Sequence, residues 1–200
     1  MSTGITYDVT NHISGPLRAL QTGLGGDRSG LNEAIGIEEL ALFRNHLIAL
    51  AESRHGTANA LGATPSGHLA QAAEKTTMRS DASGATITIT QPGMRRAFGD
   101  VDIFPGPGKK ALTIPLTAEA YNRRAIGMVG LFAIRSKEGK GLLVRKDGAG
   151  GLVALYLLVS SVHQKQDRTL LPSDEEIITA AKIGARNYVD YLLLNAGGRN

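Results

Sequence analysis

The 200-residue chain contains no cysteine and no tryptophan. The absence of thiols excludes disulfide bonds, zinc–thiolate sites and cysteine nucleophiles. Aromatic residues make up 4% of the chain and hydrophobic residues 42%, so a core has to be built mainly from Leu, Ile, Val and Ala. The longest apolar run, residues 152–159, is too short to span a bilayer. The first residues do not resemble a signal peptide, and we expect a soluble protein made in the cytosol.

Glycine, in contrast, is abundant: the chain contains 25 glycines in 200 residues, whereas glycine makes up roughly 7% of an average protein. The glycines follow no Gly-X-Y period, so they predict turns, loops and mobile segments and not collagen. The length of the chain fits the upper end of one ordinary domain, or one domain plus an appendage. We expect a flexible N-terminal arm over residues 1–30, a single α+β domain over residues 31–195 and a flexible tail over residues 196–200.

The hydrophobic pattern predicts helices near both ends of the chain and strands between them. Apolar residues recur at helical spacing over residues 31–54, and a second helix is expected to begin at Pro65. Alternating or β-rich segments predict strands over residues 5–9, 85–90, 101–103, 112–115, 131–134, 141–145 and 152–162. The last of these is typical of a central strand covered on both faces. This order predicts an α+β fold with N-terminal helices, a central antiparallel β-sheet or sandwich with long hairpins, and a C-terminal helix packed on the sheet.

The C-terminal helix has the clearest sequence signals. Ser173 and Glu176 have the spacing of a capping box, and Asp174 and Glu175 favour the positive end of the helix dipole. An apolar stripe is expected to bury one face of this helix, and it comprises Ile177, Ile178, Ala181, Ala185, Tyr188, Val189, Leu192 and Leu193. Earlier in the chain, Thr117 is expected to cap a short helix.

Positive charge is concentrated in the middle of the chain. The formal net charge is +4, but residues 92–146 hold eleven basic and four acidic residues, a local net charge of +7. Such a zone could face a polyanion such as DNA, or it could consist of solvated hairpin tips. The candidate DNA-channel or interface residues are Arg95, Arg96, Lys109, Lys110, Arg123, Arg124, Arg135, Lys137 and Lys140.

No set of residues has a catalytic or metal-binding pattern. The five histidines are scattered without the i, i+4 spacing of a helical zinc site, and they fit polar surface or loop positions. Residues 106–110 superficially resemble a phosphate-binding loop, but Lys110 stands where that loop needs Ser or Thr. Pro105 and Pro107 also remove amide donors that would bind phosphate. We therefore expect no enzymatic activity, no cofactor and no metal site.

Several short stretches resemble a known family of phage proteins. They are Thr-Pro-Ser-Gly-His-Leu at 64–69 with the strand at 86–90, Leu-Thr-Ile-Pro at 112–115 with Ala-Tyr-Asn-Arg-Arg-Ala at 120–125 and Leu-Phe at 131–132, and Leu-Tyr-Leu-Leu-Val at 155–159 leading to Leu-Pro-Ser-Asp at 171–174. Together they resemble the virion-morphogenesis proteins of Mu-like phages, which are related to tail-completion and head–tail joining proteins.

The resemblance implies a non-enzymatic structural protein of a tailed-bacteriophage virion that acts at the head–tail junction as a neck, tail-completion or tail-terminator protein. It implies a homo-oligomeric ring, contacts with other neck, portal or tail proteins, and non-specific contact with packaged DNA. Such a protein is assembled in the host cytoplasm and located in the virion, with no membrane partner. The alternatives are a small basic DNA-binding protein without sequence preference, a capsid-assembly factor absent from the finished particle, and an enzyme whose site residues the sequence does not pair.

Overall fold

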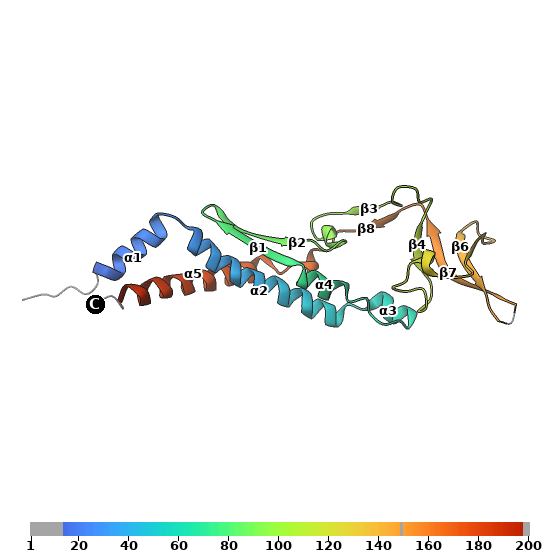
Figure 1. Ribbon diagram of the computed structural model, residues 1–200, viewed down its shortest axis with the longest axis horizontal. Helices are drawn as coiled ribbons and strands as arrows, with labels where there is room; N and C mark the ends of the chain where they lie inside the picture. The colour runs from blue at the N-terminus through green and yellow to red at the C-terminus, as the bar shows by residue number, and fades with distance from the viewer. Residues whose placement is uncertain (1–13, 149, 198–200) are drawn as a thin grey trace, which may run out of the picture. The chain divides into compact units, whose positions relative to one another are not determined.

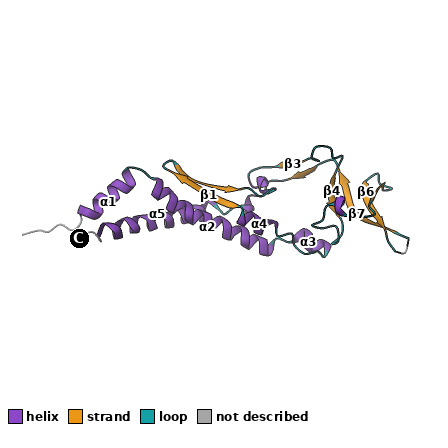
Figure 2. Cartoon of the chain, viewed as in Figure 1, coloured by secondary structure: helices purple, strands orange, loops and turns teal. Residues whose placement is uncertain are grey.

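The α+β class predicted from the sequence is confirmed by a computed structural model, which describes residues 14–148 and 150–197 (Figures 1 and 2). The strand predicted at residues 5–9 lies outside the described residues. The helices are α1 (Ser14–Gly25), α2 (Ser29–Ser53), α3 (Gly56–Leu61), α4 (His68–Glu74) and α5 (Asp174–Gly197), with short 3-10 turns η1 (Met94–Ala97), η2 (Ala125–Gly127) and η3 (Arg168–Leu170). The strands are β1 (Thr76–Asp81), β2 (Gly84–Ile89), β3 (Val101–Ile103), β4 (Leu112–Pro115), β5 (Phe132–Arg135), β6 (Gly141–Lys146), β7 (Leu152–Val159) and β8 (Val162–Gln164).

Backbone contacts divide the chain into two compact units, where the sequence predicted one domain over residues 31–195. Unit 1 consists of residues up to Asn45, Thr76–Ile89 and the chain from Pro172 onward. Unit 2 consists of His46–Lys75 and Thr90–Leu171. Each unit is therefore built from segments that are far apart in the sequence.

Unit 1 combines helices α1 and α5, the first part of α2 and the β1–β2 hairpin. Helix α1 packs against α5, although the sequence predicted a flexible arm over residues 1–30. Helices α2 and α5 meet at Gly184, where an added Cβ would lie 2.6 Å from the Ala34 carbonyl oxygen and 2.6 Å from the Ile35 Cα. Only glycine allows two helix backbones to approach this closely.

The β1–β2 hairpin lies on α2 in unit 1. Its strands pair antiparallel from Thr76↔Ile89 to Asp81↔Gly84. A Cβ at Gly36 would lie 2.9 Å from the Ala85 Cβ and 3.0 Å from the Met78 Cγ, so the hairpin side chains rest directly on the α2 backbone. The Arg44 guanidinium donates two hydrogen bonds to the Thr76 carbonyl, at 3.2 and 2.8 Å, and holds the first residue of the hairpin on α2.

The C-terminal helix begins with the predicted capping box. The Ser173 hydroxyl accepts a hydrogen bond from the Glu176 amide at 3.2 Å, and the Ser173 amide donates to the Glu176 carboxylate at 2.8 Å. The predicted apolar stripe is partly wrong at its edges, because Ile178 and Leu193 are exposed while Ala180 and Gly184 are buried. The buried face is therefore rotated toward the small residues that allow α2 to approach.

Unit 2 contains an antiparallel four-stranded sheet in the order β4-β7-β6-β5 and a separate β3–β8 pair. The strands predicted at residues 131–134 and 141–145 correspond to β5 and β6, which form a hairpin whose turn carries Arg135, Lys137 and Lys140. The segment 152–162 was predicted to be one central strand covered on both faces, and β7 is central, between β4 and β6, but the prediction was wrong about its extent and its burial. That segment forms β7 and β8 in different sheets, and Leu152 and Val153 at the start of β7 are exposed.

Two short helices of unit 2 also differ from the prediction. Helix α4 begins at His68 and not at Pro65, because Gly67 adopts a left-handed conformation with φ +66° immediately before it. Residues 117–122 form turns instead of a helix, in which the Thr117 hydroxyl accepts from the Ala120 amide at 3.3 Å. Within the described residues, none of the helices is long and apolar enough to cross a membrane.

Candidate functional site

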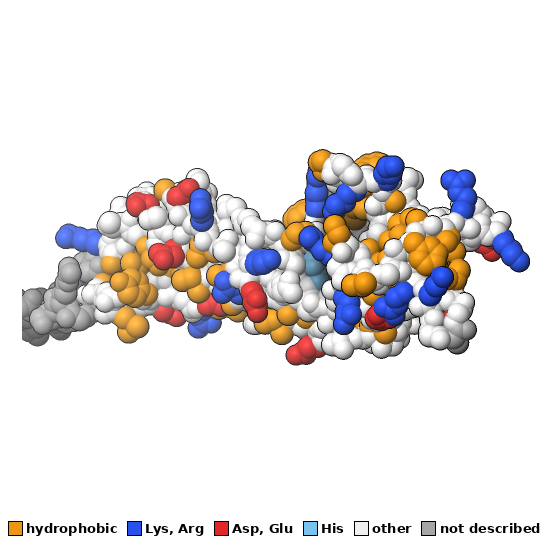
Figure 3. Space-filling view, turned by 45° about the vertical axis from the view of Figure 1, so that its right-hand side comes forward, with side chains coloured by type: hydrophobic (Ala, Val, Ile, Leu, Met, Phe, Trp, Pro, Cys, Tyr) orange, Lys and Arg blue, Asp and Glu red, His pale blue; other side chains and the backbone are white. Residues whose placement is uncertain are grey.

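The charge of the chain separates between the two units. Unit 2 carries fifteen Lys and Arg against eight Asp and Glu, whereas unit 1 carries seven against ten, so the formal net charges are +7 and −3. All nine candidate cations predicted from the sequence belong to unit 2. In the space-filling view, Lys and Arg side chains stand around exposed hydrophobic side chains on the right-hand part of the molecule (Figure 3). Unit 2 therefore presents a surface that is both basic and apolar.

The nine cations occupy four places in unit 2 and do not gather in one cavity. Arg95 and Arg96 lie on η1, Lys109 and Lys110 in the loop between β3 and β4, and Arg123 and Arg124 in the loop before η2. The other three, Arg135, Lys137 and Lys140, lie at the turn of the β5–β6 hairpin. One of the nine cations, Arg96, lines a cavity of about 450 Å³ in unit 2.

Two of these cations are neutralised by carboxylates of the same unit. The Arg96 guanidinium lies 3.7 Å from the Asp167 carboxylate, which also pairs with Arg54 at 2.8 Å. The Lys140 ammonium pairs with Glu138 at 2.9 Å. The other seven make no ion pair with any residue that the structure describes, so their charge is available to a partner.

The loop that carries Arg123 and Arg124 is held from beneath by Tyr156 of β7. This side chain is 1% exposed, and its hydroxyl lies 3.2 Å from the Ala120 carbonyl oxygen, 3.1 Å from the Arg123 carbonyl oxygen and 3.0 Å from the Met128 sulfur. Burial raises the pKa of the Tyr156 phenol, so the hydroxyl keeps the proton that it donates to the loop. The single proton of this hydroxyl is shared among the three acceptors, and it ties β7 to the backbone at the N-terminal side of the loop and to the Met128 side chain.

The same loop presents bare apolar side chains to solvent. Ile126 is 95% exposed and Val129 is 90% exposed. We call residues 123–129, with Arg123, Arg124, Ile126 and Val129 pointing outward, the arginine loop. Sequence reasoning identified the two arginines and missed both apolar residues, because residues 125–131 show no periodicity. Apolar residues around Gly127 and before Gly130, following paired arginines, were the available signal.

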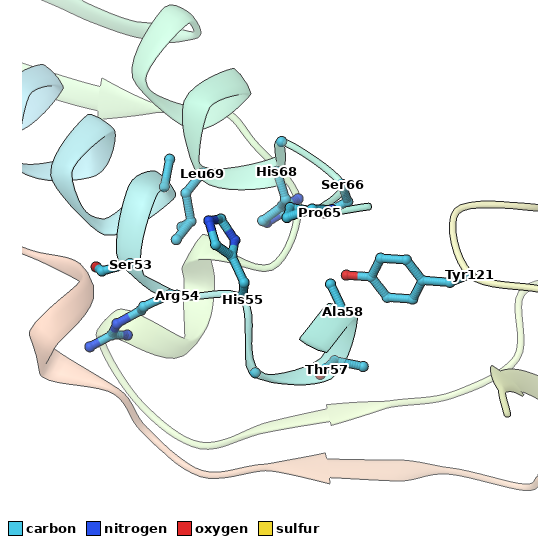
Figure 4. A pocket seen from close by; sticks show the side chains of 13 residues that line it. Ser53, Arg54, His55, Thr57, Ala58, Pro65, Ser66, His68, Leu69 and Tyr121 are labelled. Atoms are coloured by element: carbon cyan, nitrogen blue, oxygen red, sulfur yellow. The ribbon is translucent and has the colours of Figure 1, made fainter. Parts of the chain in front are cut away.

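A second feature of unit 2 is a cavity of about 320 Å³ beside α3 and α4. Figure 4 shows His55 within it, with the Tyr121 ring directed toward His55 and Ala58 from the opposite wall. His68, which the sequence placed among polar surface or loop residues, is half-buried here. The lining residues that are described include neither aspartate nor glutamate.

The hydrogen bonds around His68 indicate which tautomer its neutral ring adopts. Lys75 donates to the Gln91 side-chain oxygen at 2.8 Å, so the Gln91 amide nitrogen faces the His68 Nδ1, 3.1 Å away. The Nδ1 atom therefore accepts, and the proton of the neutral ring resides on Nε2. Burial lowers the pKa of His68, and the cations Arg96 and Lys75 lower it further. The arrangement can donate a hydrogen bond, but no carboxylate among its described lining residues can serve as a general base.

No protein-family model, no curated protein and no solved structure matches this chain. Among the residues that the structure describes, no three His, Asp or Glu side chains lie close enough together to hold a metal ion.

Proposed function

We propose that the chain is a non-enzymatic structural protein of a tailed-bacteriophage virion and acts at the head–tail junction during virion assembly. The proposal starts from the resemblance to the virion-morphogenesis proteins of Mu-like phages. The surface of unit 2 supports it independently of that resemblance.

The observation that carries the proposal is the exposure of large apolar side chains on a basic unit. Besides Ile126 and Val129, Phe98 is 71% exposed and Phe104 is 67% exposed, and all four belong to unit 2. Large exposed apolar patches on soluble proteins mark surfaces that bind other proteins. An assembly protein needs such surfaces and needs no catalytic centre.

The unpaired cations add a reason to expect DNA near the assembled protein. Arg135 and Lys137 lie at an exposed hairpin turn without a carboxylate partner among the described residues. Contact of such groups with phosphates is independent of base sequence, and a single copy neutralises few phosphates. A homo-oligomeric ring multiplies this weak attraction.

Purified phage particles and a deletion of the gene test the proposal. We expect the protein in finished virions, and we expect the deletion to produce filled heads and complete tails that fail to join. A protein that is required but absent from particles would instead be a capsid-assembly factor. Normal particles from the deletion strain, together with tight binding of the monomer to DNA, would replace the proposal with the basic DNA-binding alternative.

A further inference from the structure

A groove in unit 1 is lined by acidic side chains, whereas the arginine loop of unit 2 carries two cations. The groove lies between α2 and α5 and has a volume of about 410 Å³. Apolar and acidic side chains line it, among them Ala41, Leu42, Ile183, Glu38, Glu175 and Glu176. The described residues that line it include no Lys and no Arg. We call this feature the acidic groove.

Two carboxylates of the acidic groove accept hydrogen bonds from neutral groups of their own unit. Glu38 accepts a hydrogen bond from the Asn187 amide at 3.1 Å, and Glu176 accepts from Ser173 in the capping box. Neither hydrogen bond removes negative charge, and unit 1 as a whole carries a net charge of −3. A ligand of the groove therefore has to be apolar at its centre and cationic at its edge.

The arginine loop has this composition. Ile126 and Val129 provide aliphatic side chains that are almost fully exposed, and Arg123 and Arg124 provide two cations without an ion-pair partner among the described residues. The Tyr156 hydroxyl holds the backbone at the start of the loop, at Ala120 and Arg123, and contacts the Met128 side chain within it, which reduces the conformational entropy that the loop gives up when it binds. The charge of each surface complements the other, and both surfaces belong to this chain.

We propose that the arginine loop of one copy inserts Ile126 and Val129 into the acidic groove of a second copy, with Arg123 and Arg124 facing Glu38 and Glu175. The interface joins different surfaces of the two copies, so it is head-to-tail and continues from copy to copy until a ring closes or a filament grows. The inference deepens the assembly function proposed above and names its first partner as the chain itself. It assigns Arg123 and Arg124 to the subunit interface and leaves the hairpin cations for DNA.

Self-association of the purified full chain, measured by sedimentation velocity and native mass spectrometry, tests this interface. We expect Ile126→Asp, and separately Arg123→Glu with Arg124→Glu, to weaken association at least roughly tenfold, because each removes a central element of a small interface. The matched control is Lys109→Glu with Lys110→Glu, which makes the same change in charge on another exposed loop of unit 2. The control is expected to associate like the unaltered protein.

Complementary defects identify the two surfaces. Ala41→Arg fills the acidic groove and retains a good helix former on α2, so it blocks association without breaking the helix. Ile126→Asp leaves the groove intact, and Ala41→Arg leaves the loop intact. A mixture of the two variants is therefore expected to form a 1:1 dimer that grows no further, although neither variant associates alone. Combining Glu38→Lys and Glu175→Lys with Arg123→Glu and Arg124→Glu should restore longer assemblies.

Three results would overturn the proposed interface: a monomeric unaltered protein at about 100 µM, which exceeds the Kd of most specific interfaces; loop variants that associate normally; or a mixture that forms no dimer. Binding of a different protein in the groove of a monomeric chain would count as the first of these. The outcome is separate from that of the proposed function. A chain that assembles through this interface but is absent from phage particles would retain the inference and reject the phage role.

Discussion

Replacement of Gly184 by alanine provides a sharp test of the packing between α2 and α5. Alanine is normally favoured over glycine inside a helix by about 1 kcal/mol. At this position, however, the new methyl group would lie 2.6 Å from two backbone atoms of α2, the Ala34 carbonyl oxygen and the Ile35 Cα. Neither atom can rotate away as a side chain would, so the two helices must separate by about 1 Å to reach ordinary van der Waals contact.

Overpacking of this kind costs typically 1–3 kcal/mol, and separation of the helices also weakens the packing around Gly184. The cost exceeds the gain in helix propensity at most values in this range, so we expect Gly184→Ala to lower the free energy of unfolding by about 1 kcal/mol. Gly25→Ala is the matched control, because no atom lies within 4 Å of an added Cβ at that helical position. Urea denaturation followed by circular dichroism measures both variants. A Gly184→Ala protein as stable as the unaltered chain would refute the close backbone approach.

Three further predictions concern hydrogen bonds. Ser173→Ala should lower the free energy of unfolding by about 0.5–2 kcal/mol through loss of the capping box, and unchanged urea melting would reject that role. Burial and nearby cations lower the pKa of His68 in the folded protein. Its neutral form therefore stabilises unit 2 above the unfolded pKa of about 6.5, and this contribution to the free energy of unfolding disappears as the pH falls through and below that value. We expect the stability of His68→Gln to depend less on pH. Tyr156→Phe should increase hydrogen exchange of the amides in residues 120–128 while the β6–β7 pairing stays protected, and equal exchange in both proteins would show that the hydroxyl does not fix the loop.

The parts of the fold that the sequence predicted are those with local signals. The C-terminal helix begins where the Ser173 and Glu176 spacing placed it, because a capping box involves residues within one turn. Strand β1 was missed because Thr76–Asp81 contains one large apolar residue, Met78, and takes its structure from pairing with β2 and from resting on Gly36. Long-range interactions of this kind leave no periodicity to read.

The candidate functional surface could also be predicted only in part from the sequence. Basic residues are visible in a sequence one by one, so all nine cations could be named in advance. Their environment could not, because the pairing of Arg96 with Asp167 joins residues 71 positions apart, and the fixing of the arginine loop depends on a tyrosine in β7. The acidic groove could not be predicted from the sequence either, because the carboxylates of Glu38 and Glu175 come together only when α2 lies beside α5.

Charge-reversal substitutions can therefore separate two proposed functions of the basic residues, subunit association and DNA binding. If Arg123 and Arg124 hold subunits together, their replacement by glutamate weakens self-association at least roughly tenfold, whereas Arg135→Glu with Lys137→Glu leaves the assembled state intact. If the hairpin cations bind phosphates, the second pair of substitutions weakens DNA binding by the assembly and reduces the slope of log K against log salt by about 0.9 for each phosphate that a copy no longer neutralises. Fluorescence anisotropy with DNA fragments of unrelated sequence, at several salt concentrations, measures both the slope and its independence of sequence. An unchanged slope after Arg135→Glu with Lys137→Glu would mean that these cations face solvent, and the assembly role would then rest on the arginine loop alone.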